Sequence, residues 1–362
     1  MRKKTRKNRV KVKLVTIVLL AIALFLLQLL ENHPAAIERY YSEGVYLWIC
    51  RILHPIFNLL PFSLGDVIYL VIIALIIYAF IKLIGLLFKK QFKPALILFF
   101  TVIIWMQGAS LAFYLLWGLN YYRPSAAERL KLTDTSYTTP ELIKLTTEFI
   151  DSANATRARV KPADLAQPND TIFKVGIAAV NMLSDSSTAF RTYYPKIKPS
   201  LFTHLINYMG TSGYYNPFTT ESQMNYQMPV FLRPFVVCHE LSHQMGYGPE
   251  DEANFVGFLA GVKSNNRLLR YSAYYEVVGE FMQDLHMRDS VQQKQLKLRV
   301  SPAVHQDFVA ERKYWMAYAG PAEMISSVFY NGFLKANNQP EGLLTYNRMI
   351  LLVIAWHRKN FH

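Results

Sequence analysis

Residues 236–246 read VVCHELSHQMG and contain the pattern HELSH at 239–243. The apolar residues that precede the pattern predict a buried helix, on which positions i and i+4 share one face. Two imidazoles placed in this way can bind one zinc ion at about 2.0–2.1 Å. Glu240 would lie beside the metal, where its carboxylate can accept a proton from zinc-activated water and pass it to a leaving amine. We therefore predict a zinc site with His239 and His243 as ligands and Glu240 as the general base.

A third ligand is expected shortly after this helix. The glycines and the proline at 246–249 predict that the helix ends there and that a second helix begins. The first turn of the second helix carries Glu250, Asp251 and Glu252. Apolar residues follow Glu252 at offsets of 3, 4 and 7, which favours Glu252 as the acid on the inward face and as the third zinc ligand. Glu250 and Asp251 are alternative ligands, or acids that the helix dipole favours in a first turn.

The basic residues locate a membrane region. Lys plus Arg exceeds Asp plus Glu by 14, and twelve of the basic residues lie in two clusters, at 1–13 and 82–93. Three long apolar runs lie beside these clusters, at about 14–30, 67–88 and 95–117. Because a helix needs about 20 mainly apolar residues to cross a bilayer, we predict three membrane spans over these runs.

The positive-inside rule keeps both basic clusters in the cytoplasm and puts the chain after the third span outside it. We therefore predict a membrane region over 1–122 with a cytoplasmic N-terminus, and an extracytoplasmic domain over 123–362. Residues 45–62 are apolar but interrupted by charge and proline, which predicts an interfacial segment. Trp117 and the tyrosines at 121–122 would form an aromatic belt at the end of the third span. A cleaved signal peptide is the alternative for the first run, and it leaves the C-terminal domain outside as well.

Composition excludes several classes of protein. With 52% hydrophobic and only 18% charged residues, the chain is neither disordered nor a typical nucleic-acid binder, despite its net charge of +14. Two cysteines exclude a disulfide scaffold and a cysteine-rich metal site. Membrane lipid is therefore the expected partner of the basic clusters, and we expect no nucleic-acid partner.

The predicted domain is mainly helical, in an α+β arrangement. Residues 214–227 favour extended chain with a turn. Within them, Tyr214 to Thr220 form either an edge strand that pairs with an extended peptide or a plain hairpin. Asn254 either holds the second nitrogen of a ligand histidine or faces solvent. Candidates for stabilising the oxyanion of a cleavage reaction are Tyr330, Tyr346, His286 and Arg348.

The stretch HELSHQMG…EDEANFVGFLA resembles the zincin metallopeptidases of the glutamate-zincin type, whose zinc ligands are two histidines and a glutamate. More narrowly, the chain resembles a bacterial, mainly Bacteroidetes, membrane-anchored family of unknown function in that clan. The segments that carry this resemblance are PFSLGD, YYNPFT, HELSHQ, DEANF and YNGFLKANNQPEG…YNRM. The resemblance implies a zincin-like fold, a peptidase activity and a place in the bacterial inner membrane. Two positions depart from related patterns: Pro249 replaces the third ligand of metzincins, and Val256 stands four residues after Glu252, where many membrane glutamate-zincins have aspartate.

These observations favour a membrane-anchored zinc metallopeptidase that cleaves envelope or periplasmic peptides or proteins. One alternative is a non-catalytic membrane sensor or scaffold, in which zinc is structural or the zincin-like domain is inactive. A second alternative is a zinc amidase that acts on another envelope polymer.

Overall fold

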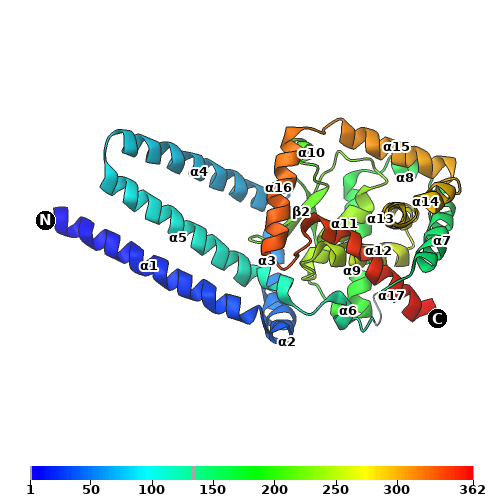
Figure 1. Cartoon of the computed structure of the whole chain (residues 1–362), viewed down its shortest axis with the longest axis horizontal. Helices are drawn as coiled ribbons and strands as arrows, with labels where there is room; N and C mark the ends of the chain where they lie inside the picture. Colours follow the sequence, from blue (N-terminus) through cyan, green and yellow to red (C-terminus); the bar gives the residue numbers. More distant parts are fainter. Residues whose placement is uncertain (1, 133–135, 362) are drawn as a thin grey trace.

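The computed structural model describes residues 2–132 and 136–361 and consists of a helical stalk joined to a mostly helical domain (Figure 1). Three long helices form the stalk, namely α1 (Arg2–Leu30), α4 (Leu64–Phe88) and α5 (Phe92–Leu116). Helix α5 packs against both of the others. The N-terminus and the turn between α4 and α5 lie at the end of the stalk that points away from the domain (Figure 1).

The predicted spans are confirmed as helices that are long and apolar enough to cross a membrane. These helical segments are Arg9–Leu30, Leu64–Phe88 and Phe92–Leu116. They begin three to five residues earlier than predicted, because a helix continues into polar residues that an apolar run leaves out. Helix α4 illustrates this point, since the Ser63 hydroxyl caps its first turn by accepting a hydrogen bond from the backbone nitrogen of Asp66.

Short helices connect α1 to α4, namely α2 (Pro34–Ala36), the π-helix η1 (Ile37–Val45) and α3 (Tyr46–Asn58). The predicted interfacial segment is therefore mostly helix α3. One face of α3, with Tyr46, Cys50 and His54, is buried against the domain. The opposite face carries exposed apolar side chains, including Trp48 and Ile52. Helix α3 thus has one face packed against the domain and an opposite face that is apolar and exposed.

Residues at the end of the third span are buried in the domain. Trp117, Tyr121 and Tyr122 pack in one cluster with Tyr41 and Tyr46 of the connecting segment. The prediction that Trp117, Tyr121 and Tyr122 form a lipid-facing belt is wrong, because their rings fill the junction between stalk and domain. The predicted boundary at residue 122 consequently falls inside a cluster of residues that pack together.

The domain is built around two helices that cross its core, α11 (Arg233–Gln244) and α12 (Glu250–Lys263). They pack against α9 (Asn169–Ser186) and α13 (Arg267–Arg288), and α13 packs in turn on α7 (Thr139–Arg157). The remaining α-helices are α6 (Ala126–Arg129), α8 (Pro162–Leu165), α10 (Thr203–Tyr208), α14 (Ser290–Lys297), α15 (Pro302–Met316), α16 (Pro321–Ala336) and α17 (Met349–Phe361). The 3-10 turns are η2 (Gly118–Tyr122), η3 (Thr188–Phe190) and η4 (Gly342–Arg348).

One small sheet completes the described part of the chain. Its strands are β1 (Ile197–Pro199), β2 (Gly213–Asn216) and β3 (Glu221–Met224), in the order β1-β3-β2. Strand β3 pairs in parallel with β1 and antiparallel with β2, so that Tyr215 lies opposite Ser222. The prediction of a mainly helical fold with a hairpin before the HELSH helix is therefore confirmed. Strand β2 is both one arm of that hairpin and an edge of the sheet.

A glycine sets the separation of the two central helices. A Cβ atom on Gly257 of α12 would lie 3.1 Å from the backbone nitrogen of His239 on α11. That distance is closer than side chains normally approach, so glycine allows α12 to pass directly beside the turn that carries the first histidine. The first turn of α12 is thereby held against the HELSH helix.

Candidate metal centre

The HELSH helix is positioned by burial at both ends. Pro234 lies in the first turn of α11, and Phe235 and Val237 are buried in the core just before the histidines. The helix ends as predicted, with Gly246 in the left-handed conformation at a φ of 79°. Within α11, His239 and His243 lie one turn apart on the same face, with ring centroids separated by 5.0 Å.

Glu250 faces both imidazoles. Its Oε2 lies 3.2 Å from Nε2 of His239 and 3.7 Å from Nε2 of His243. All three side chains are buried, as is that of Glu240. The potential ligand atoms of His239, Glu240 and His243 also lie within 4.8 Å of one another. The structure therefore brings together the three residues that HELSH predicted, and it adds Glu250, the first residue of α12.

Glu252 does not reach this cluster. Its carboxylate accepts hydrogen bonds from the backbone nitrogen of Ala126, at 2.6 Å, and from the guanidinium of Arg129, at 2.9 Å. The placement of Glu252 beside the histidines was wrong because α12 is buried on every side from Ala253 to Gly261. Where all faces of a helix are buried, apolar offsets no longer identify a single inward face.

The second nitrogen of each imidazole is held by the protein. Nδ1 of His243 lies 2.7 Å from the backbone oxygen of Tyr247, and Nδ1 of His239 lies 2.7 Å from Oδ1 of Asn254. Since both oxygens accept, each Nδ1 carries the hydrogen, and a neutral ring presents the lone pair of Nε2 toward Glu250. Asn254 thus lies where its proposed orienting role requires. Asn254 also stands four residues after Glu250. With Glu250 as the acid beside the histidines, the position four residues later is therefore polar, whereas the position four residues after Glu252 is Val256.

The donor set fits a zinc ion. A tetrahedral zinc site with ligand distances of about 2.0–2.1 Å has edges of about 3.3–3.4 Å. The distances of 3.2 and 3.7 Å between the Glu250 oxygen and the two Nε2 atoms are close to those edges. Two imidazole nitrogens and one carboxylate oxygen form the three-ligand set of catalytic zinc sites, which keep a fourth position open.

The electrostatics of the cluster favour a cation between these side chains. Burial opposes a charge on His239, but its hydrogen bond to Glu250 and the charges of Glu240 and Glu250 outweigh burial and raise the pKa of His239 to about 9. Burial lowers the pKa of His243 to about 4. Burial also opposes the charge of Glu250, yet the two imidazoles lower its pKa to about 2. The carboxylate that stabilises a proton on one ring would equally stabilise a metal cation between both rings.

Glu240 is placed as a base rather than as a structural acid. Its side chain is only 2% exposed, and its Oε2 has no hydrogen-bond partner among the described residues. Burial raises the pKa of Glu240 to about 8; the charge of His239 opposes this rise and that of Glu250 adds to it. Strand β2 passes directly beside it, because a Cβ atom on Gly213 would lie 2.5 Å from Oε1 of Glu240. Glycine at the start of β2 therefore keeps the space beside this carboxylate open.

The structure describes the side chains of three of the four oxyanion candidates. Among these three, Tyr330 reaches the cluster: its hydroxyl donates to Oε1 of Glu250 at 2.5 Å. Arg348 pairs with Glu341, and His286 is exposed in the last turn of α13. The side chain of Tyr346 lies outside the described residues.

Residues of the membrane-proximal segments also contact the cluster, which the sequence did not predict. The indole nitrogen of Trp117 donates to the backbone oxygen of His243 at 3.0 Å. The hydroxyl of Tyr46 donates to the backbone oxygen of Gln244 at 3.1 Å. The Tyr215 ring of β2 packs beside them, 4.9 Å from the Trp117 ring and 6.2 Å from the His243 ring. In the sequence, the signal for these contacts was the concentration of aromatic residues beside the second and third spans.

The hairpin that borders Glu240 is fastened to the first turn of α4. The hydroxyl of Tyr214 donates to Asp66 at 2.6 Å, and the Glu221 carboxylate accepts from the backbone nitrogen of Gly65 at 2.7 Å. Glu221 also pairs with Lys198 at 2.5 Å, with both side chains 3% exposed. The segments PFSLGD and YYNPFT, distant in sequence, therefore meet in space at the junction of stalk and domain.

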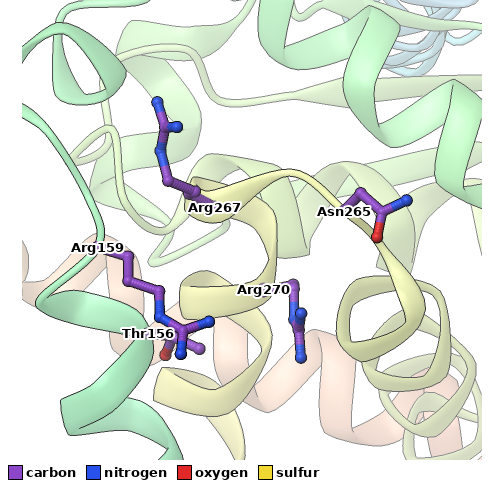
Figure 2. Close-up of a pocket in the computed structure, with 5 residues that line it drawn as sticks. All are labelled: Thr156, Arg159, Asn265, Arg267 and Arg270. Atoms are coloured by element: carbon purple, nitrogen blue, oxygen red, sulfur yellow. The ribbon is translucent and has the colours of Figure 1, made fainter.

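A small pocket elsewhere in the domain is unrelated to this cluster. It has a volume of about 90 Å³ and is lined by Thr156, Arg159, Asn265, Arg267 and Arg270 (Figure 2). Figure 2 shows the guanidinium of Arg267 directed away from Arg159 and Arg270, and Arg267 pairs with Asp164. Its lining side chains include no carboxylate, histidine or cysteine, so they offer no set of metal donors.

Comparison with known proteins gives one match. The family model described as "Protein of unknown function (DUF3810)" matches residues 41–354, which include the α3 segment, α4, α5 and the whole cluster on α11 and α12. No curated protein and no solved structure matches the chain.

Proposed function

The chain belongs to the DUF3810 family, and from its own geometry we propose that it is a membrane-anchored zinc metallopeptidase with a zincin-like domain. The observation that carries the proposal is the convergence of His239, His243 and Glu250 beside the unpartnered carboxylate of Glu240. This arrangement differs from the sequence prediction in one ligand, since Glu250 takes the place of Glu252.

The proposed ligands are Nε2 of His239, Nε2 of His243 and Oε2 of Glu250. A bound zinc ion would polarise a peptide carbonyl and lower the pKa of water. Asn254 and the Tyr247 carbonyl hold the two rings in orientation, and Tyr330 holds Glu250. Each ligand is thus fixed by a neighbour, which is the support that a preorganised metal site needs.

Glu240 performs the proton transfers in this proposal. Its carboxylate accepts a proton from the attacking water and later donates it to the nitrogen of the leaving amine. Its burial and raised pKa suit both steps, since a group that titrates near neutral pH can give the proton back. General acid–base catalysis by one positioned side chain contributes roughly 10²–10⁴-fold to the rate.

A peptide or protein is the proposed substrate because an edge strand borders the base. Strand β2 is an edge of the small sheet and passes beside Glu240 at Gly213. An extended peptide that adds to this edge would place a backbone carbonyl near the zinc ligands. Backbone pairing with β2 would then align the substrate with the site without requiring a particular side chain.

The proposed location is the bacterial inner membrane, with the domain on the periplasmic side. Both basic clusters belong to the N-terminus and the α4–α5 turn, at the end of the stalk away from the domain. The positive-inside rule then assigns that end to the cytoplasm. Envelope peptides and proteins would be the accessible substrates, and zinc the cofactor.

The test uses the full chain in detergent, because residues before 123 contact the HELSH helix. Metal content is measured for the wild type and for Glu240→Gln, and cleavage of a mixed peptide library is followed by mass spectrometry. The matched control is Glu128→Gln, which changes an exposed acid in the same way. We expect stoichiometric zinc in all three proteins, and loss of cleavage in Glu240→Gln alone.

The other outcomes separate the alternatives. Undiminished cleavage by Glu240→Gln would refute the mechanism. Zinc without cleavage of any peptide by the wild type would favour a structural site or an amidase. A wild-type protein that binds no stoichiometric metal would overturn every zinc-based function.

A further inference from the structure

Helix α16 exposes a broad apolar face. Met324, Ile325, Val328 and Phe329 are 65%, 55%, 68% and 76% exposed, and Phe333 continues the same face one turn later. Their spacing of 1, 4, 5 and 9 residues from Met324 is that of one side of a helix. Four large apolar side chains exposed side by side exceed what a soluble surface normally shows.

The opposite face of α16 is turned toward the metal centre. Tyr330 reaches Glu250 from this face, and Leu334 is fully buried beneath it. The helix therefore has a defined orientation: the side with Tyr330 and Leu334 faces the domain, and the exposed apolar side points outward.

Helix α16 packs directly against the end of the third candidate span. The Phe333 ring lies 6.0 Å from the ring of Phe113, which belongs to the last turn of the third span. The Tyr122 hydroxyl donates to the backbone oxygen of Ala336 at 3.4 Å. Figure 1 shows α16 standing across the ends of α4 and α5, between the stalk and the domain. Its apolar face thus lies next to the apolar surface of the third candidate span.

Two other segments near this end of the stalk also expose apolar side chains. The exposed stripe of α3 consists of Trp48, Ile52 and Ile56, and Leu59 extends it at 84% exposure. Leu201, two residues before α10, and Leu205, within it, are also exposed. The backbone nitrogen of Leu201 donates to Asp66 in the first turn of α4. We call the apolar faces of α3, α10 and α16 the collar.

The metal centre lies immediately behind the collar. Trp117 is the first residue after the third span, and its ring centroid is 5.8 Å from that of His243. A candidate ligand is therefore separated from the end of a membrane helix by little more than one side chain.

We infer that the collar lies in the bilayer surface on the domain's side, and that the site takes peptide segments tethered to that same membrane. The first half stands on the collar alone, whereas the substrate class rests on the function proposed above. A fully extended chain spans about 3.3–3.6 Å per residue, so a segment about 3–5 residues from its anchor would reach a site within about 10–15 Å of the surface. Tethering also raises the effective substrate concentration without any new contact.

The membrane half is tested by site-specific labelling. The native cysteines, Cys50 and Cys238, are fully buried, so an introduced exposed cysteine is the one that takes a thiol-reactive fluorophore. Phe329→Cys on the collar and Val291→Cys on α14 are labelled in the full chain. Both are reconstituted in vesicles of phosphatidylcholine and phosphatidylglycerol that contain nitroxide-labelled phosphatidylcholine.

We expect the nitroxide lipid to quench the fluorophore at position 329 strongly and the one at position 291 little. Equal, weak quenching at both positions would overturn the inference, whatever activity the protein has. The Val291 variant is the matched control because that side chain is 63% exposed and belongs to α14.

The substrate half compares one cleavable peptide in two forms, free in solution and attached to a lipid through a short linker. In the same vesicles we expect the tethered form to be cleaved at least about tenfold faster at equal bulk concentration. Replacing both Val328 and Phe329 by aspartate should remove this advantage, while free-peptide cleavage in detergent stays within about twofold of the wild type. Val291→Asp serves as the control.

The outcomes distinguish the two proposals. Quenching at position 329 without cleavage of either peptide would refute the peptidase and, with it, the substrate class, but leave the collar in the membrane. Equal cleavage of free and tethered peptide would overturn the substrate class while the peptidase stands.

Discussion

The HELSH region buries polar side chains, and the collar exposes apolar ones. Both therefore depart from the usual pattern of apolar interiors and polar surfaces. Around α11 and α12, the polar side chains His239, Glu240, His243 and Glu250 are at most 8% exposed. On α16, by contrast, Phe329 is 76% exposed although it is large and apolar. Burying charge is costly without partners, and exposing apolar surface is costly in water. The buried charges of His239 and Glu250 offset each other at 3.2 Å, whereas Phe329 stays largely exposed.

The comparison teaches what each region lacks. In the proposals above, a zinc ion would bind among the buried polar side chains, and lipid would cover the exposed apolar ones. The two regions share Tyr330, whose helix carries the exposed apolar face while its hydroxyl holds a candidate ligand. The following predictions test each side of this comparison, from the largest expected effect to the smallest.

Replacing Glu250 and Glu252 of α12 separately by glutamine tests the candidate metal centre most strongly. Glu250→Gln removes a ligand and should weaken zinc binding by more than the roughly 10–100-fold that loss of a ligand's hydrogen-bond partner costs. Glu252→Gln should retain zinc and instead lower thermal stability, because it leaves buried Arg129 unpaired. Zinc content after dialysis against a chelator is the measurement. The opposite pattern would restore Glu252 as the ligand.

The buried pair at the stalk junction should contribute strongly to stability. Lys198→Met leaves Glu221 buried without its charge partner, a change that costs about 3–5 kcal/mol. It also removes the hydrogen bonds from the Lys198 ammonium to the backbone oxygens of Phe57 and Phe62. Lys297→Met, on the exposed surface of α14, is the control. An unchanged melting temperature in detergent would show that the junction does not hold the hairpin.

Acid should loosen α3 from the domain through His54. Its Nδ1 lies 2.6 Å from the backbone oxygen of Tyr193, and burial lowers the pKa of His54 to about 4 from an ordinary 6.5. The unfolded state takes up a proton below pH 6.5 and the folded state only near pH 4, so stability present above pH 6.5 is lost as the pH falls toward 4. The shift corresponds to about 3 kcal/mol.

His54→Gln should flatten this pH dependence, measured as melting temperature between about pH 7 and about pH 4.5. His286→Gln, which changes an exposed histidine, should leave the slope as it is in the wild type. If the slopes of the wild type and His54→Gln coincide, His54 is not the group responsible.

Loss of the Asn254 contact should have a moderate effect. Asn254→Ala removes the acceptor for Nδ1 of His239 and should lower zinc affinity roughly 10–100-fold. Asn254→Asp keeps an acceptor at that place and should restore the affinity. Competition with a metal indicator measures both variants, and an alanine variant with wild-type affinity would contradict the orienting role.

Tyr330→Phe should have the smallest effect if Tyr330 only positions Glu250. We then expect about a tenfold loss of zinc affinity and little change in kcat at saturating zinc. A fall of about 10²–10³-fold in kcat with zinc retained would instead identify Tyr330 as an oxyanion donor.

Much of the architecture was predictable because its signals are local. The three helices of the stalk follow from long, mainly apolar runs, and the ends of α11 follow from Pro234 and Gly246. The choice between Glu250 and Glu252 was not predictable, since it depends on Arg129 and Ala126, which approach from a segment more than 120 residues away.

The sequence by itself determined the kinds of chemistry present: two histidines and a glutamate at helical spacing, three apolar helices, and basic residues grouped at one end of the stalk. These features depend on short-range periodicity and on composition, which a linear chain displays directly. Only the tertiary structure decided which acid faces the imidazoles, that Trp117 and Tyr46 support the HELSH helix, and that α16 presents its apolar side beside the spans. Those outcomes depend on which distant segments pack together, because packing brings each buried polar group to its partner and leaves the remaining apolar faces exposed.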